Sequence, residues 1–190
     1  MSLPERLESN AWTGEGSAAQ EATKETAIWA ARPDRARGGD LFPSSPADPW
    51  DWRHPDVGWG LILPDAPDVD AAARARAEDA PEPIRRLVAA RGDPAPVLRW
   101  SAGGALGHLH RDHADGTREA LPLVGRSWGT APGRLPRYLL IHAAPDVVPW
   151  RVQQLLQSVC FTGRLDLEGE ALDRYVTALL EGWPGSAADP

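Results

Sequence analysis

Between residues 58 and 183 the chain alternates short apolar runs with segments in which apolar positions recur every three or four residues. Short apolar runs bounded by proline or glycine predict strands buried in a sheet, and the longer spacing predicts helices that bury one face. The predicted strands cover 58–64, 96–100, 137–145 and 160–167, and the predicted helices cover 82–92, 149–157 and 169–183.

Residues 107–125 have a different pattern, with two alternating arms on either side of Asp115-Gly116. An Asp-Gly pair between alternating segments is the sequence signal for a hairpin with a tight turn. The order strand, helix, strand, hairpin, strand, helix, strand, helix predicts an α/β fold. We expect a mainly parallel sheet with right-handed crossovers, helices on both faces and an inserted hairpin.

The first 48 residues lack this alternation and are dominated by Ala, Glu, Ser, Gly and Pro. Only AQEATKETAIWAA within them has helical spacing, and RPDRARGGD ends it. This composition predicts a poorly ordered leader over 1–48, an α/β domain over 49–183 and a flexible tail over 184–190.

Composition restricts the classes of partner. The formal net charge of −7 argues against nucleic acid or an anionic membrane as a partner. No apolar stretch approaches a membrane span of about 18 residues, and the N-terminus has no secretory signal. Cys160 is the single cysteine, which excludes an internal disulfide, and Lys24 is the single lysine, a bias typical of GC-rich bacterial genomes. We therefore expect a cytoplasmic protein.

The first hairpin arm contains His108-x-His110-x-Asp112-His113. This spacing resembles that of the metallo-β-lactamase-type hydrolases, and the resemblance implies zinc held by three histidines, with Asp112 on a second metal. That family takes further ligands (a His, an Asp and a His) from downstream, whereas this chain has only His142 after the motif. We therefore predict that the motif is hairpin surface and that the protein has no metal or cofactor. A zinc hydrolase is kept as an alternative.

Nine tryptophans are many for this length, and Trp50, Trp52 and Trp59 lie together in DPWDWRHPDVGWG. Aromatic side chains this dense usually anchor a loop onto a core or form an interface. These three residues are therefore candidates for binding a protein partner.

The second half of the chain contains motifs of a known family. RLPRYLLIHAAPDVVPWRVQQLLQ, followed by FTGRLDLEGEALDRYVTALL, resembles the first part of the gingipain-like, caspase-related cysteine peptidase domain. DWRHPDVGWGLILPD and PIRRLVAARGDPAPVLRW also resemble the leading strand–helix–strand of larger bacterial proteins with such domains. The resemblance covers about residues 50–183, and its motifs are Tyr138-Leu139-Leu140-Ile141, Val148-Pro149, Gly163-Arg164 and Leu172-x-x-Tyr175.

The resemblance implies a half domain without the catalytic groups, because the family's catalytic His and Cys lie on later strands than this sequence contains. The family's usual glycine after the Y-L-L strand is replaced here by Ala143-Ala144. Cys160 lies between Val159 and Phe161, which predicts a buried core thiol rather than a nucleophile. We therefore expect a non-catalytic scaffold or pro-region of a gingipain-like peptidase system, inactive as an isolated chain.

A half sheet that ends at the 169–183 helix would leave an unpaired strand edge, which proteins normally cover. The expected partner is a C-terminal catalytic segment, another subunit or a second copy. A stand-alone interaction module that uses the three tryptophans or this edge is the alternative. Arg164 could bind a carboxylate in a cleft, but a structural ion pair with Asp166 is the simpler expectation.

Overall fold

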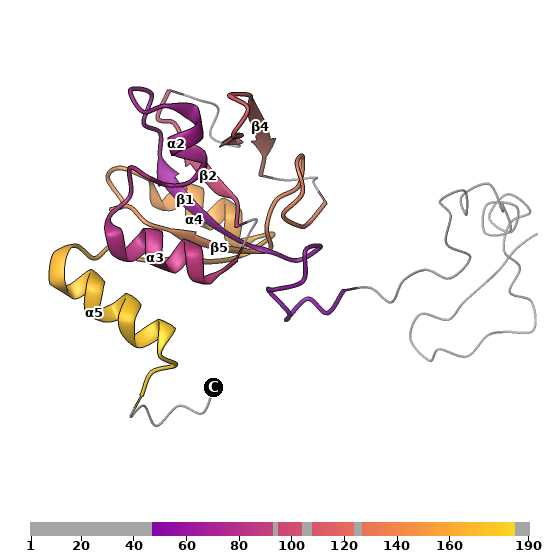
Figure 1. Ribbon diagram of the computed structural model, residues 1–190. Helices are drawn as coiled ribbons and strands as arrows, with labels where there is room; N and C mark the ends of the chain where they lie inside the picture. Colours follow the sequence, from indigo (N-terminus) through magenta and orange to yellow (C-terminus); the bar gives the residue numbers. More distant parts are fainter. Residues whose placement is uncertain (1–46, 93–94, 104–107, 124–126, 185–190) are drawn as a thin grey trace, which may run out of the picture. The chain divides into compact units, whose positions relative to one another are not determined.

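The computed structural model describes residues 47–92, 95–103, 108–123 and 127–184. In this part of the chain six strands form one sheet in the order β4-β3-β2-β1-β5-β6 (Figure 1). The strands are β1 (Trp59–Pro64), β2 (Val97–Trp100), β3 (His108–Asp112), β4 (Arg118–Pro122), β5 (Tyr138–Ile141) and β6 (Phe161–Arg164).

The sheet is mixed, although its larger part is parallel. Strands β2, β1, β5 and β6 pair in parallel, whereas β3 is antiparallel to both β2 and β4. The predicted α/β class is confirmed, and the predicted hairpin supplies the antiparallel part. Its turn contains Gly116 at φ +85°, and the His113 N–H donates to the Thr117 carbonyl across it.

Four helices accompany the sheet in the described part of the chain: α2 (Ala71–Ala75), α3 (Glu82–Ala90), α4 (Trp150–Gln157) and α5 (Gly169–Leu180). The last three match the predicted helices. The short helix α2 was not predicted, because five residues are too few to show a period. The Asp70 carboxylate starts it by accepting hydrogen bonds from the Ala72 and Ala73 N–H groups.

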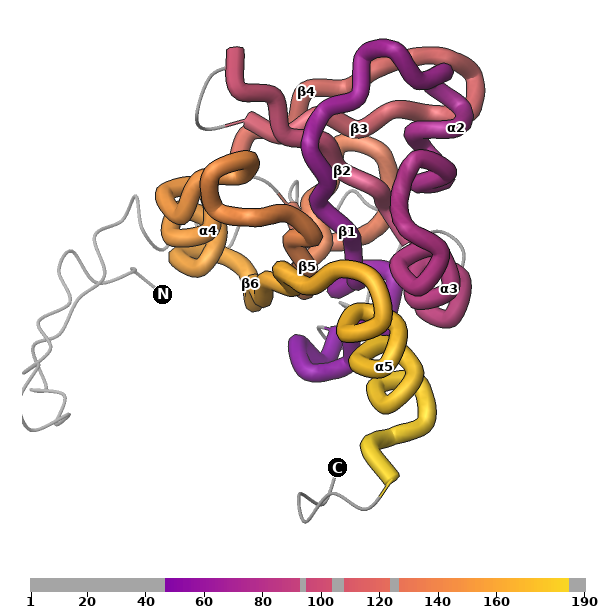
Figure 2. The backbone as a smooth tube through the Cα atoms, turned by 90° about the vertical axis from the view of Figure 1, so that its left-hand side faces the viewer, coloured from indigo at the N-terminus to yellow at the C-terminus, as the bar shows by residue number. Residues whose placement is uncertain are grey.

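The helices cover both faces of the sheet, as expected for parallel strands (Figure 2). One face packs Ile62 of β1 and Ile141 of β5 against α4, through Val152 and Leu156. Alternate strand residues form the core on the opposite face, where α3 and α5 lie side by side. That second core contains Leu61, Leu63, Ala77, Ala80, Ile84, Leu87, Val97, Leu165, Leu172 and Val176.

Two predicted strands are too long. The predictions over 137–145 and 160–167 shorten to Tyr138–Ile141 and Phe161–Arg164, so His142 follows β5 rather than lying inside it. The predicted leader lies outside the described residues up to residue 46. No helix among the described residues is long and apolar enough to cross a membrane.

A buried ion pair joins β2 to the segment between α2 and α3. Arg99 has 0% exposed surface, and its guanidinium donates to both Asp79 carboxylate oxygens at 2.7 Å. The same guanidinium donates to the carbonyls of Pro64 and Arg74. Burial alone would raise the pKa of Asp79, but the hydrogen bonds and charge of Arg99 outweigh it and hold that pKa below its usual value.

We predict that Arg99→Met lowers the free energy of unfolding by about 3 kcal/mol at pH 7, because it leaves a largely enclosed carboxylate unpaired. The folded-state pKa of Asp79 is depressed, so the pair stabilises the fold above the unfolded-chain pKa of about 4. Its contribution is lost as the pH falls through the folded-state pKa. Urea unfolding at pH 7 and at about pH 3 should therefore show a smaller deficit in acid. A deficit that does not change with pH would contradict this, and Arg85→Met, at an exposed position of α3, is the matched control.

Candidate interaction site

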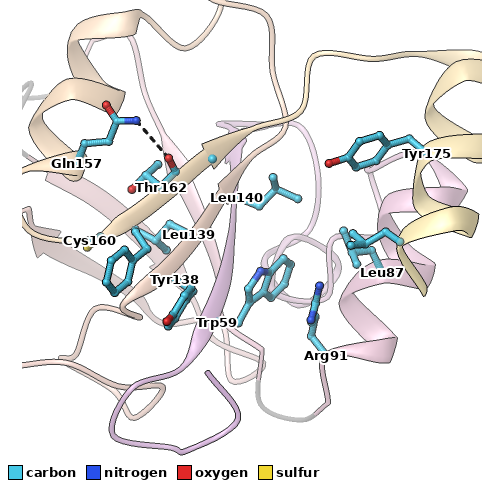
Figure 3. Close-up of a pocket in the computed structure, with 13 residues that line it drawn as sticks. Trp59, Leu87, Arg91, Tyr138, Leu139, Leu140, Gln157, Cys160, Thr162 and Tyr175 are labelled. Atoms are coloured by element: carbon cyan, nitrogen blue, oxygen red, sulfur yellow. Dashed lines mark hydrogen bonds between the residues drawn. The ribbon is translucent and has the colours of Figure 1, made fainter. Parts of the chain in front are cut away.

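A groove of about 550 Å³ runs along the open edge of the sheet, between β5, β6 and the helices α3 and α5 (Figure 3). Leu140 and Gly163 form its floor, while Leu87 and Tyr175 line its helical side. It exists because α5 packs beside α3 instead of over β6. Arg86 of α3 fixes that position by donating hydrogen bonds to side-chain oxygens of α5 at 3.0 Å (Asp173) and 2.9 Å (Thr177).

Strand β6 is paired on one side only within the described residues. The Phe161 N–H donates to the carbonyl of Arg137, the residue before β5, and the Leu165 N–H donates to the carbonyl of Ile141 in β5. Because backbone groups alternate along a strand, the N–H groups of Thr162 and Arg164 point away from β5. The Thr162 carbonyl accepts only a 3.3 Å bond from the Gln157 side chain among described groups, so the edge is ready to pair with another strand.

The floor of the groove has unfilled space at Gly163. No atom lies within 4 Å of the position that a Cβ would take there, and its backbone is not in the left-handed region. The Thr162 Oγ1 atom is enclosed and has no hydrogen-bond partner among the described residues. A parallel strand is normally covered on both faces, whereas this side of β6 is open.

The candidate tryptophans fall into two places. Trp50 is 70% exposed and packs at a tilt against Phe161 of β6, with ring centroids 5.3 Å apart. Trp59 is half-buried and lines the groove, while Trp52 lies beyond it beneath Arg91. The structure therefore brings Trp50 and Trp59 to the open edge and leaves Trp52 in a neighbouring pocket.

Arg164, the fourth candidate, joins the segment between β5 and α4 to β6 by hydrogen bonds. Its guanidinium donates to the carbonyls of Ala143 and Val148 at 2.6 and 2.8 Å and to the Gln153 side chain at 2.9 Å. The expected partner, Asp166, makes no ion pair with it within 4.0 Å among the described residues. Burial lowers the pKa of Arg164, and the charge of Asp166 opposes that shift.

The histidine motif lies on the hairpin, as predicted, but its three histidines are half-buried rather than on an open surface. His108 and His110 belong to β3, and His113 Nε2 lies 3.5 Å from a Glu119 oxygen. Asp112 is buried, and Arg74 donates to both of its oxygens at 2.8 and 2.9 Å. No group of three or more metal-ligating side chains gathers among the described residues.

The electrostatics follow from these contacts. Burial would raise the pKa of Asp112, but the hydrogen bonds and charge of Arg74, together with Arg118, lower it overall. Burial and the charge of Arg118 lower the pKa of His110, so this imidazole is neutral near pH 7. A metal would have to displace Arg74 before it could use Asp112.

We predict that neither zinc nor EDTA changes the midpoint of thermal unfolding, because Arg74 occupies both oxygens of Asp112. A metal that binds the folded state raises this midpoint, so differential scanning fluorimetry is a direct measurement. A zinc-dependent increase that disappears in His110→Ala would restore the hydrolase alternative.

Cys160 is buried at 6% exposure in the core under α4. Burial raises the pKa of its thiol to about 12, and the nearby charge of Arg137 only partly opposes this. The thiolate is the reactive form of cysteine, so the predicted role as a core residue agrees with its surroundings.

We predict that iodoacetamide alkylates Cys160 at pH 8 far more slowly in the native protein than in urea, by about a hundredfold or more. Intact mass spectrometry over time measures both rates. Alkylation at similar rates in the two states would show an accessible, activated thiol and would contradict the assignment.

Sequence reasoning missed a polar crevice at the carboxyl ends of β1 and β5, where open α/β sheets commonly bind ligands. His142 lies there with its Nδ1 atom 3.1 Å from the Leu165 carbonyl, together with Asp65 and Asp79. Burial lowers the pKa of His142. Both carboxylates already pair with arginines, so the crevice offers less free polar capacity than the edge groove.

No protein-family model, curated protein or solved structure matches the chain. The case for a site therefore rests on the geometry of the described residues.

Proposed function

We propose that residues 47–184 are a non-catalytic scaffold of a gingipain-like cysteine peptidase system, completed by a strand-bearing segment that adds to β6 and carries the catalytic groups. The family assignment rests on the sequence motifs around Tyr138–Ile141 and Gly163-Arg164. The observation that carries the interaction is the open β6 edge beside an apolar groove.

The geometry of this edge favours a folded segment over a bare peptide. Thr162 and Arg164 present backbone groups to a neighbour, and that neighbour would extend the parallel part of the sheet. A parallel strand needs a crossover, usually a helix, and a helix lying on this face would fill the space above Gly163. The occupant we infer is therefore a strand with an accompanying helix, supplied by a polypeptide segment outside the described residues.

A stand-alone interaction module is the second candidate. It is supported by the exposed ring of Trp50, which extends the aromatic surface of Phe161 and Tyr138 along the edge. An extended peptide pairing with β6 would contact these three rings without any helix in the groove.

We predict that a photo-crosslinker, p-benzoylphenylalanine, placed at Tyr175 on the helical side of the groove forms an adduct with a segment of another polypeptide in cells that express the full chain. Sequencing of the adduct by mass spectrometry should identify an apolar strand followed by a helix. Thr162→Pro should reduce the adduct about tenfold, because proline removes an N–H that faces away from β5 and leaves the N–H groups paired to β5 intact. The same crosslinker at exposed Arg85 is the positional control.

Three outcomes would contradict this proposal: no adduct at Tyr175, equal adducts at both positions, or an adduct unchanged by Thr162→Pro. Gly163→Val provides a second test, because its side chain fills the groove without strain and should reduce the adduct formed at Tyr175. If light scattering shows a dimer that Thr162→Pro dissociates, the edge pairs with a second copy and the heterologous scaffold is wrong. An adduct with an extended peptide alone would favour the interaction module.

A further inference from the structure

A second pocket lies beside the groove, at the amino ends of β1 and β2, and has a volume of about 480 Å³. The turn that begins at Asp51 forms one wall, and the loop around Thr130 forms another. The Thr130 N–H donates to the Pro55 carbonyl at 2.9 Å, and this close approach leaves no room for a side chain at Gly129. The lining relevant to binding is Trp52, Arg53, Pro55, Trp59, Arg91 and Thr130.

Two arginines converge on one indole ring in this pocket. The guanidinium carbons of Arg53 and Arg91 lie 4.3 and 4.5 Å from the centroid of Trp52, and that of Arg91 lies 5.6 Å from the centroid of Trp59. Such contacts hold the guanidinium planes against the rings and leave their N–H edges for other partners.

These N–H edges meet no side-chain acceptor in the part of the chain that the structure describes. Among the described residues neither Arg53 nor Arg91 has a carboxylate partner, and no described residue lining the pocket is acidic. The Arg91 Nε atom is enclosed without a hydrogen-bond partner in the described part of the chain. Other arginines of the domain, such as Arg74, Arg99 and Arg118, pair with aspartates.

The arrangement is electrostatically costly as it stands. Burial lowers the pKa of Arg91, and the positive charge of Arg53 lowers it further. Two guanidinium groups beside one ring repel each other, and an enclosed donor without an acceptor costs free energy. An oxyanion between them would relieve both penalties through charge-assisted hydrogen bonds.

We propose that Arg53, Trp52 and Arg91 form a binding site for an oxyanion, a carboxylate or a phosphate, carried on an apolar or aromatic group. The two guanidinium groups hold the oxyanion, and Trp59 and Pro55 contact the apolar body. The volume lies within the range of about 300–1,000 Å³ that is usual for small-ligand pockets. This inference does not depend on strand addition at β6.

The test is a titration of the full chain followed by NMR of the Trp52 indole N–H and the Arg91 Nε–H. The probes are benzoate, phenyl phosphate and, as an uncharged analogue, benzamide, all at constant ionic strength. We expect saturable shifts of both resonances with at least one anion and none with benzamide. The tighter of the two anions identifies carboxylate or phosphate as the preferred group.

Variants make the test specific. Arg53→Gln and Arg91→Gln should each weaken anion binding about tenfold, the effect of losing one charge-assisted hydrogen bond. Arg85→Gln is the matched control. Arg85 is exposed on α3, the helix that Arg91 caps, and this variant should bind like the wild type. Arg53 is exposed, so its variant keeps the test valid even if Arg91→Gln unfolds. The absence of saturable shifts with either anion, equal shifts with benzamide, or equal affinity in Arg53→Gln would overturn the proposal.

Discussion

A parallel strand must have both faces covered and its backbone groups paired, and the whole domain is arranged around this constraint. β1 satisfies it completely, with parallel neighbours on both sides and Leu61 and Ile62 buried against opposite cores. The antiparallel hairpin continues the sheet beyond β2. On the other side β5 is the one strand that pairs with β6 in the part of the chain that the structure describes, and the position of α5 leaves the groove next to it open.

The main elements could be predicted because their signals are local. The apolar run in β1 and the three- and four-residue spacing in α3 each depend on a few neighbouring residues, and Asp115-Gly116 defines its own turn. The predicted ends of β5 and β6 are wrong because a strand ends where its hydrogen-bonding partner ends. The sequence of one segment does not specify which residues of another segment pair with it. The cytoplasmic location and the peptidase relationship stay predictions.

The site could be predicted only in part because it depends on contacts between distant segments. An open edge follows from the element order, but the groove requires α5 to lean on α3 through Arg86, which no local pattern specifies. The partner of Arg99 could not be predicted for the same reason. The run VLRW indicates a buried strand, but it does not indicate that Asp79 neutralises the arginine. The histidine motif shows the converse. Alternation on a hairpin arm can reproduce a metal-binding spacing while Asp112 binds Arg74 instead.

The edge groove and the arginine pocket share a wall, because Trp59 and Arg91 line both. The Arg91 side chain leaves α3's C-terminal end between the two cavities and rests on Trp52 and Trp59. A group that fixes this guanidinium from the pocket side also fixes one wall of the groove, and a helix seated in the groove limits where the guanidinium can move. Binding free energies coupled through one side chain are reciprocal. If both proposals hold, the position of Arg91 links the binding of a small oxyanion to the completion of the sheet.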